Sequence, residues 1–365
     1  MEMKRRDLFK LMGLGLSGLG LSRFAESSAF AQQKAAVSQA AAQPGPIPVR
    51  DQGRPNIFNW PFDEVRIPYR ERKDKVKWPN DAKLAVRIYI TAEWDSGAEN
   101  FSTLTGSQGY EGVYDRPNLY MISQNAQYTF TVGIYRAIDV VNKHGFKISV
   151  ASDGGAVVAY PDMHKEMHNL GWEIMSRSWD HRVAPYLLKK GEEEAYELKR
   201  ITDGIVKVTG EHPAGWLSPG GRGTASWAKL LADNGYLYTS DLNGDDIPYG
   251  LKLGDKMLVV IPHRQFSTND FHTFLGVGTL GFPGIALRDV QTAFDHFRHV
   301  FDAWYETAST EFPNQLLYGI HPYWSCLPDR IAFHDKALAY MKGFKDIWFP
   351  RHKDMAQYWK DTYLS

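Results

Sequence analysis

The chain has 365 residues, of which 43% are hydrophobic and 23% are charged, and this composition indicates a globular protein with a sizeable core. Its 42 basic and 42 acidic residues give a formal net charge of zero, so the basic excess typical of nucleic-acid-binding proteins is absent. The single cysteine, Cys326, excludes an intrachain disulfide and a cysteine-rich zinc site.

The N-terminal segment has the features of an export signal. A basic cluster at 4–6 precedes a leucine- and glycine-rich run at 11–21 that is too short to span a bilayer as a stable helix, and small residues near position 30 suit a cleavage site. Residues 5–10 resemble a twin-arginine signal, although Leu8-Phe9 stands where the common pattern has Phe-Leu; an ordinary Sec signal is the alternative. We therefore predict an export signal over 1–31 and a periplasmic or secreted mature protein.

The next segment is rich in alanine, glutamine and proline and lacks helical or strand periodicity from 32 to about 55. We predict a tether and surface strap over 32–79, followed by one domain over 80–365.

Apolar strands alternate with amphipathic helices from about residue 80. No glycine-rich phosphate loop accompanies them, so about seven β/α units favour a single distorted (β/α) barrel over an open dinucleotide-binding sheet. In chain order, the predicted elements are a strand at 84–91, a helix at 133–145, a strand at 146–152, a helix at 161–171, a strand at 172–176, a helix at 191–210, a strand at 214–218, a helix at 224–235, strands at 236–240 and 256–262, a helix at 287–308, a strand at 315–321, a helix at 330–343 and a strand at 346–349.

Polar motifs follow the predicted strands, where barrels place their chemistry. They read "TAEWDSGAE", "SRSWDHR", "WLSPGGRG", "SDLNGDD", "IPHRQ" and "GIHPYW". This ordered set resembles the polysaccharide deacetylase (NodB-homology, carbohydrate esterase 4) superfamily over roughly 80–350, most clearly in "VVAYPDMHKEMHNLGWEIMSRSWDH". "DDIPY" and "IHPYW" look most like its allantoinase-like and peptidoglycan-deacetylase-like branch. The resemblance implies a distorted (β/α) barrel that hydrolyses C–N bonds other than peptide bonds.

The resemblance also implies a base and a metal site. The family's first motif places the general base on Glu93 and a metal ligand on Asp95. The family's metal triad is Asp-His-His; Asp95 and His181 match it, but Arg177 replaces the first histidine. Arginine keeps its proton and cannot ligate a metal, and two protein ligands are few for a catalytic zinc.

Three arrangements are compatible with Arg177. His263 or His321 completes the shell of a divalent metal such as zinc; water completes it; or the guanidinium replaces the metal and binds a substrate carboxylate or an oxyanion. We favour the third. A purely structural alternative is a buried ion pair of Arg177 with Asp180 or Asp95.

The remaining motifs supply an acid and the walls of the substrate site. By resemblance, His321 is the general acid; the plain alternative is a core histidine bonded to the backbone. By resemblance, the "WLSPGG" motif forms one wall of the groove; an ordinary turn is the alternative. The two aspartates of "DDIPY" would shape the pocket; a solvated acidic loop is the alternative. These predicted substrate-binding residues are Trp216, Ser218, Pro219, Asp245 and Asp246.

The sequence thus predicts an exported hydrolase of amide C–N bonds, with a carboxylate that activates water. An envelope-glycan deacetylase and a small cyclic amide or ureide hydrolase are rivals within this class. A non-catalytic glycan-binding barrel is the alternative from another class. The expected partners are a glycan or small-molecule substrate and the twin-arginine machinery, with no nucleic acid and no stable membrane span after signal removal; an oligomer is compatible with the sequence.

Overall fold

A computed structural model describes residues 62–94, 127–263, 268, 270–275, 287 and 289–365, together with two short strands, β1 (Val49–Arg50) and β2 (Arg54–Pro55). The chain forms two compact units, Met1–Asn59 and Trp60–Ser365. In the first, β1 and β2 pair antiparallel. The predicted export signal, most of the predicted tether and Asp95 lie outside the described residues.

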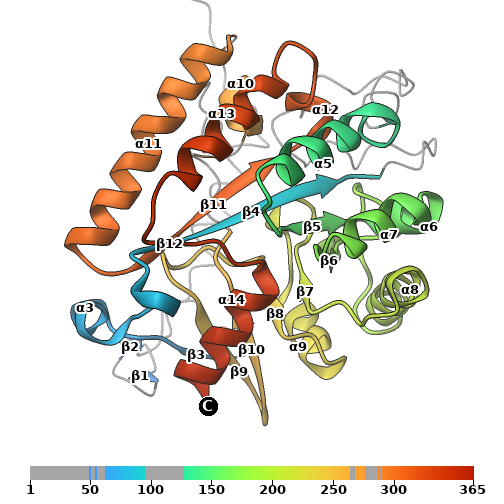
Figure 1. The fold of residues 1–365 in the computed structure, drawn as a ribbon. Coiled ribbons are helices and arrows are strands. Elements are labelled where there is room, and N and C mark those ends of the chain that lie inside the picture. The colour runs from blue at the N-terminus through green and yellow to red at the C-terminus, as the bar shows by residue number, and fades with distance from the viewer. Residues whose placement is uncertain are drawn as a thin grey trace, which may run out of the picture. The chain divides into compact units, whose positions relative to one another are not determined.

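The second unit is built on one large mixed sheet (Figure 1). The strands from β11 to β10 run parallel to one another, and β9 and β3 continue the sheet antiparallel. The last parallel strand of the chain thus pairs with the first, as a barrel requires. In spatial order the strands are β11 (Asn314–Ile320), β4 (Leu84–Ala92), β5 (Ser149–Ser152), β6 (Glu173–Ser176), β7 (Gly215–Trp216), β8 (Tyr238–Thr239), β10 (Lys256–Val260), β9 (Tyr249–Leu253) and β3 (Asp63–Val65), with β12 (Ile347–Trp348) paired to β4.

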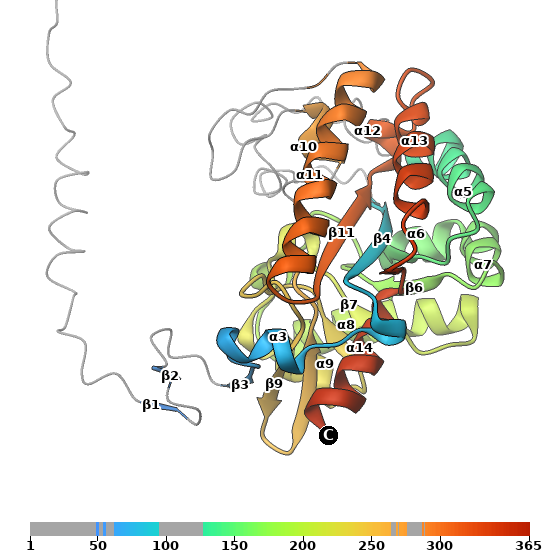
Figure 2. The same cartoon turned by 60° about the vertical axis from the view of Figure 1, so that its left-hand side comes forward.

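Helices connect the parallel strands and surround the sheet (Figures 1 and 2). None of the helices within the described ranges is both long enough and apolar enough to cross a membrane. The helices are α3 (Arg72–Lys75), α5 (Ile134–Lys143), α6 (Gly154–Ala159), α7 (Pro161–Asn169), α8 (Glu192–Thr209), α9 (Ala225–Asp233), α10 (Asp270–Leu275), α11 (Val290–Thr310), α12 (Pro322–Ser325), α13 (Ile331–Lys342) and α14 (His352–Trp359); single 3₁₀ turns lie at Tyr69–Glu71, Pro79–Asp81, Pro185–Leu187 and Pro219–Gly221, and single π turns at Thr129–Gly133 and Lys360–Leu364.

Two features differ from the sequence-based prediction. β9 and β10 form an antiparallel hairpin about a turn in which Gly254 has a φ of +70°, whereas only one strand was predicted there. The compact unit also begins at Trp60, and β3 adds a strand to the sheet within the segment predicted to be a strap. β3 is too short and too exposed to show a strand pattern in the sequence.

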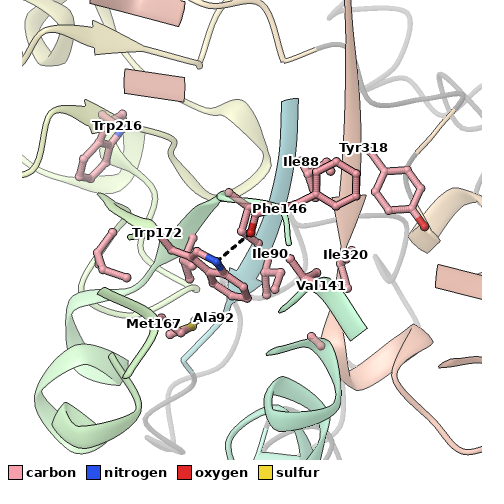
Figure 3. Close-up of a cluster of buried hydrophobic side chains, with 14 of the residues drawn as sticks. Ile88, Ile90, Ala92, Val141, Phe146, Met167, Trp172, Trp216, Tyr318 and Ile320 are labelled. Atoms are coloured by element: carbon pink, nitrogen blue, oxygen red, sulfur yellow. Dashed lines mark hydrogen bonds between the residues drawn. The ribbon is translucent and has the colours of Figure 1, made fainter. Parts of the chain in front are cut away.

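Strand β4 is buried on both faces, because all nine of its residues are buried. Successive side chains point to opposite faces of a strand. Alternate residues from Leu84 to Ala92 therefore join the outer core, the cluster between the sheet and the helices, where the Trp172 indole N–H donates to the Phe146 carbonyl at 3.2 Å (Figure 3). Ala85 and Tyr89 face the other way, into the inner core, which includes residues of α14.

Candidate active site

Three charged residues directly follow three neighbouring strands, at the same position in their register. Ala92 of β4 pairs with Ser152 of β5, which pairs with Ser176 of β6. Tyr89 of β4, Ala151 of β5 and Met175 of β6 all point to the inner core. Because alternate residues of a strand share a face, the residue that follows each member of this rung also points to the inner side of the sheet. The residues that follow this rung are Glu93, Asp153 and Arg177.

Glu93 is the centre of the cluster and is 4% exposed. Its Oε1 accepts a hydrogen bond from Arg177 Nη1 at 2.9 Å, and its Oε2 accepts one from the Tyr323 hydroxyl at 3.0 Å. His181 Nε2 lies 3.9 Å from Oε2, and His321 Nε2 lies 3.8 Å from Oε1. One buried carboxylate thus contacts a guanidinium, a phenol and two imidazoles.

The charges around Glu93 keep it ionised. Burial opposes ionisation, but His181, Arg177 and His321 outweigh it and lower the pKa of Glu93 to about 2. Burial lowers the pKa of His181 to about 4, so this ring is neutral at pH 7. His181 therefore adds its charge beside Glu93 only at low pH, whereas the permanent charge of Arg177 remains beside the carboxylate at neutral pH.

Asp153 is a further member of the site, and the sequence analysis missed it. Its Oδ2 accepts the Trp94 backbone N–H at 2.8 Å and lies 3.7 Å from His181 Nδ1, and its Oδ1 lies 4.0 Å from Arg177 Nε. Burial raises the pKa of Asp153 well above its usual range, although the charge of Arg177 opposes this. The available signal was its place directly after a predicted strand, which matches that of Glu93.

His321 enters the site from the strand next to β4. Ile320, the last residue of β11, pairs with Ile90, and His321 follows it at the start of α12. Asp270 of α10 accepts two hydrogen bonds from His321, from Nδ1 at 2.8 Å and from the backbone N–H at 2.6 Å. Burial opposes protonation of the ring, but Asp270 outweighs it and raises the pKa of His321. No predicted element contained Asp270, so the sequence analysis missed it.

The predicted wall motif is held by another acid that was missed. Asp241, which follows β8, accepts the Trp216 indole N–H at 3.1 Å and the Ser218 backbone N–H at 2.7 Å. Burial raises the pKa of Asp241 to about 6. Pro219 opens the 3₁₀ turn that follows Ser218. The substrate-binding role of this motif stays a prediction.

The acidic pair lies in a different setting. Asp245 is 8% exposed and binds the Arg72 guanidinium through both carboxylate oxygens, at 2.7 and 2.8 Å; Arg66 Nη1 lies 2.7 Å from its Oδ2. The backbone N–H of Asp246 also donates to Asp245, at 2.8 Å. Asp245 thus joins this loop to the segment around β3, while a substrate contact for either residue stays a prediction.

The structure also shows the position of Asp180, a predicted ion-pair partner of Arg177, and of His263, a predicted metal ligand. Asp180 accepts a hydrogen bond from Arg182 Nε at 2.6 Å, whereas the hydrogen-bond partner of Arg177 is Glu93. His263 places its Nε2 3.2 Å from the Tyr89 hydroxyl.

These residues do not fit a divalent cation. In the described ranges, no three His, Cys, Asp or Glu side chains are arranged to hold a metal ion. The Arg177 guanidinium lies between the carboxylates of Glu93 and Asp153, and its fixed charge would repel a cation held there. Of the predicted ligands, His181 and His321 lie within 4 Å of Glu93, and Asp95 lies outside the described residues.

Comparison with known proteins gives a family match over part of the chain and shows the fold. Residues 127–239 match the family model described as Polysaccharide deacetylase. The crystal structure of Puue allantoinase superposes with a TM-score of 0.66 and 22% identity over 84% of this chain and 99% of that chain. A "probable Polysaccharide deacetylase from Pseudomonas aeruginosa PAO1" superposes with a TM-score of 0.63 and 23% identity over 81% of this chain and 95% of that chain. Among curated proteins, no sequence matches this chain.

The predicted resemblance and the α/β barrel class are therefore confirmed. Over residues 127–239 the chain is similar to the polysaccharide deacetylase family, which supports the predicted hydrolase of C–N bonds other than peptide bonds.

Proposed function

We propose that this protein is an exported deacetylase-type hydrolase in which Glu93 is the general base, His321 the general acid, and Arg177 with His181 the oxyanion site. The observation that carries the proposal is the buried carboxylate of Glu93, which lies within 4 Å of Arg177, His181 and His321. Amide hydrolysis needs a base for water, a donor for the carbonyl oxygen and an acid for the leaving nitrogen.

The attack uses Glu93 and Arg177 together. Glu93 takes a proton from water as the water oxygen bonds to the carbonyl carbon, and the carbonyl oxygen gains negative charge. Arg177 offers a fixed cation with several donors to that oxygen. As the donors of Arg177 bind the oxyanion, Arg177 stabilises the ionised form of Glu93 less. The pKa of Glu93 therefore rises during the step in which it accepts a proton.

The collapse of the intermediate uses His321. Asp270 accepts the Nδ1 proton, so Nε2 faces Glu93 and the reacting centre. Nε2 gives its proton to the leaving nitrogen as the C–N bond breaks, which yields a free amine and an acid. The raised pKa of His321 suits this role, because the ring keeps its proton to a higher pH than an ordinary histidine does.

We propose an N-acetylated envelope glycan as the substrate. The family model and the twin-arginine-type segment at 5–10 support it. Tyr186, which is 49% exposed, lies on the loop that follows His181, and the Arg222 guanidinium lies 5.9 Å from its ring centre. Such a platform suits the face of a sugar ring. The fold shared with Puue allantoinase supports the second candidate, a small cyclic amide or ureide.

An assay of released acetate and of ring opening tests this function. Periplasmic and cytoplasmic fractions of the producing cells would be supplied with N-acetylated glycan oligomers and, separately, with a cyclic ureide. We expect acetate release in the periplasmic fraction, and its loss in the Glu93→Gln and His321→Ala variants. Full activity in both variants contradicts the assignment. Retention on immobilised glycan without acetate or ring-opened product supports a non-catalytic binding barrel instead.

Metal analysis tests the replacement of the metal by Arg177. Because the described site residues do not fit a divalent cation, we expect protein purified without an affinity tag to carry well below one transition-metal ion per chain. We also expect a chelator to leave its activity unchanged. Plasma mass spectrometry measures the content, with Asp95→Ala as the comparison. About one ion per chain that is lost in this variant would contradict the prediction and restore a metal site around Asp95 and His181.

A further inference from the structure

A buried chain of hydrogen bonds continues behind Asp270, away from the reacting centre. The Ser325 hydroxyl at the end of α12 contacts Asp270 Oδ2. His334 of α13 places its Nε2 2.7 Å from that hydroxyl, and the Tyr318 hydroxyl of β11 lies 2.7 Å from His334 Nδ1. Ser325, His334 and Tyr318 are each fully buried. The catalytic role of His321 does not by itself require these three residues.

The chemistry of each group sets the direction of these hydrogen bonds. Burial raises the pKa of Tyr318 well above its usual range and lowers the pKa of His334 to about 4, so a phenol meets a neutral imidazole. The phenol donates to Nδ1, which leaves the imidazole proton on Nε2 to donate to the Ser325 oxygen. The Ser325 proton is then directed to Asp270, and the His321 Nδ1 proton reaches the other carboxylate oxygen. Every donor in the chain is used once.

We propose that His334 is a positioning residue for the reaction: through Ser325 it holds the Asp270 carboxylate against His321, which leaves Nε2 of His321 directed at the substrate. This inference rests on the proposed function, in which His321 is the acid. It adds a histidine that touches neither the substrate nor the reacting atoms. A serine hydroxyl free to rotate could equally donate to the His321 carbonyl, 3.2 Å away, and Asp270 would lose one of its donors.

The test compares two substitutions of His334 with one of its neighbour. His334→Phe keeps a planar ring but removes both nitrogens, and His334→Gln retains an amide donor for Ser325. Phe333→Leu is the matched control, because the Phe333 ring is buried 5.2 Å from the His334 ring and takes no part in the hydrogen bonds described. Thermal unfolding identifies the temperature at which all three variants are folded.

We expect His334→Phe to lower kcat about tenfold with little change in KM, as is usual when a group that orients a catalytic residue is lost. His334→Gln should recover most of this loss, and Phe333→Leu should leave kcat near that of wild type. Wild-type kcat in His334→Phe, or an equal loss in Phe333→Leu, would overturn the proposal.

A second readout does not depend on turnover. In ring-labelled histidine NMR spectra, the Nδ1 proton of His321 bonded to Asp270 should give a downfield resonance, assigned by its loss in His321→Ala. We expect that resonance to shift or broaden in His334→Phe and to persist in Phe333→Leu. An unchanged resonance in His334→Phe would overturn the inference. Absence of hydrolysis by wild type would instead overturn the proposed function, and the two failures are thus distinguishable.

Discussion

Replacing Arg177 by glutamine is expected to lower kcat/KM about a thousandfold, the usual upper cost of removing one donor to an oxyanion. The variant loses the positive charge beside Glu93 and the donors that we assign to the carbonyl oxygen. Steady-state kinetics on the proposed substrate measure the effect. Arg182→Gln is the matched control, because Arg182 lies on the same loop, its side chain is 8% exposed, and its ion-pair partner is Asp180. An equal loss in the control would contradict the assignment.

The same variant is expected to change the response to acid. In wild type, the pKa of Glu93 is lowered to about 2, so the base stays ionised across the ordinary pH range. Without Arg177, burial is no longer offset by that charge and the pKa rises. As the pH decreases, Glu93 should therefore become protonated in Arg177→Gln at a pH at which it is still ionised in wild type. The activity of the variant should fall in that pH range, while protonation of Glu93 should not affect wild type there. Parallel pH profiles for the two proteins would contradict this reason for the loss.

Replacing Asp245 by asparagine is expected to lower the free energy of unfolding by about 3–5 kcal/mol, the usual cost of removing one partner from a buried ion pair. The change leaves the guanidinium of Arg72 buried without its carboxylate and removes a partner from Arg66, whose side chains are 8% and 7% exposed. Urea denaturation followed by circular dichroism measures the loss.

Glu64→Gln is the control for this prediction. Glu64 also pairs with Arg66, at 2.8 Å, but its side chain is 35% exposed, so its removal should cost at most about 1 kcal/mol. A raised KM with unchanged stability in Asp245→Asn would contradict the structural role and favour the substrate contact that the family resemblance implies.

Much of the second unit could be predicted from its sequence, because its helices are amphipathic and end in recognisable residues. Helix α8 was expected at 191–210 and spans Glu192–Thr209; Gly210, with a φ of +76°, ends it. The strands were harder to delimit. β7 was expected at 214–218, but only Gly215 and Trp216 pair as a strand; both residues are buried. The extent of pairing depends on neighbouring strands, which local pattern does not encode.

Some residues of the candidate site could be predicted from the sequence and others could not. Glu93, Arg177, His181 and His321 stand in motifs at strand ends, and the structure brings these four together. Tyr323 and Asp270 could not be assigned so directly. Tyr323 lies in the "GIHPYW" motif but reaches Glu93 only because α12 turns back over β4. Asp270 belongs to a short helix without a clear apolar period, so its contact with His321 is visible only in three dimensions.

The pairing of β11 with β4 also has a consequence for the order of folding. These strands are in register over seven residues, from Asn314–Leu84 to Ile320–Ile90, and lie side by side (Figure 2). Glu93 directly follows β4, and Tyr323, the phenol that donates to it, lies 230 residues later in the chain. Contacts of such long range form slowly, because a large loop must close before they are made. A nascent chain on the ribosome therefore carries Glu93 long before it carries His321, and the two residues come together only when β11 pairs with β4.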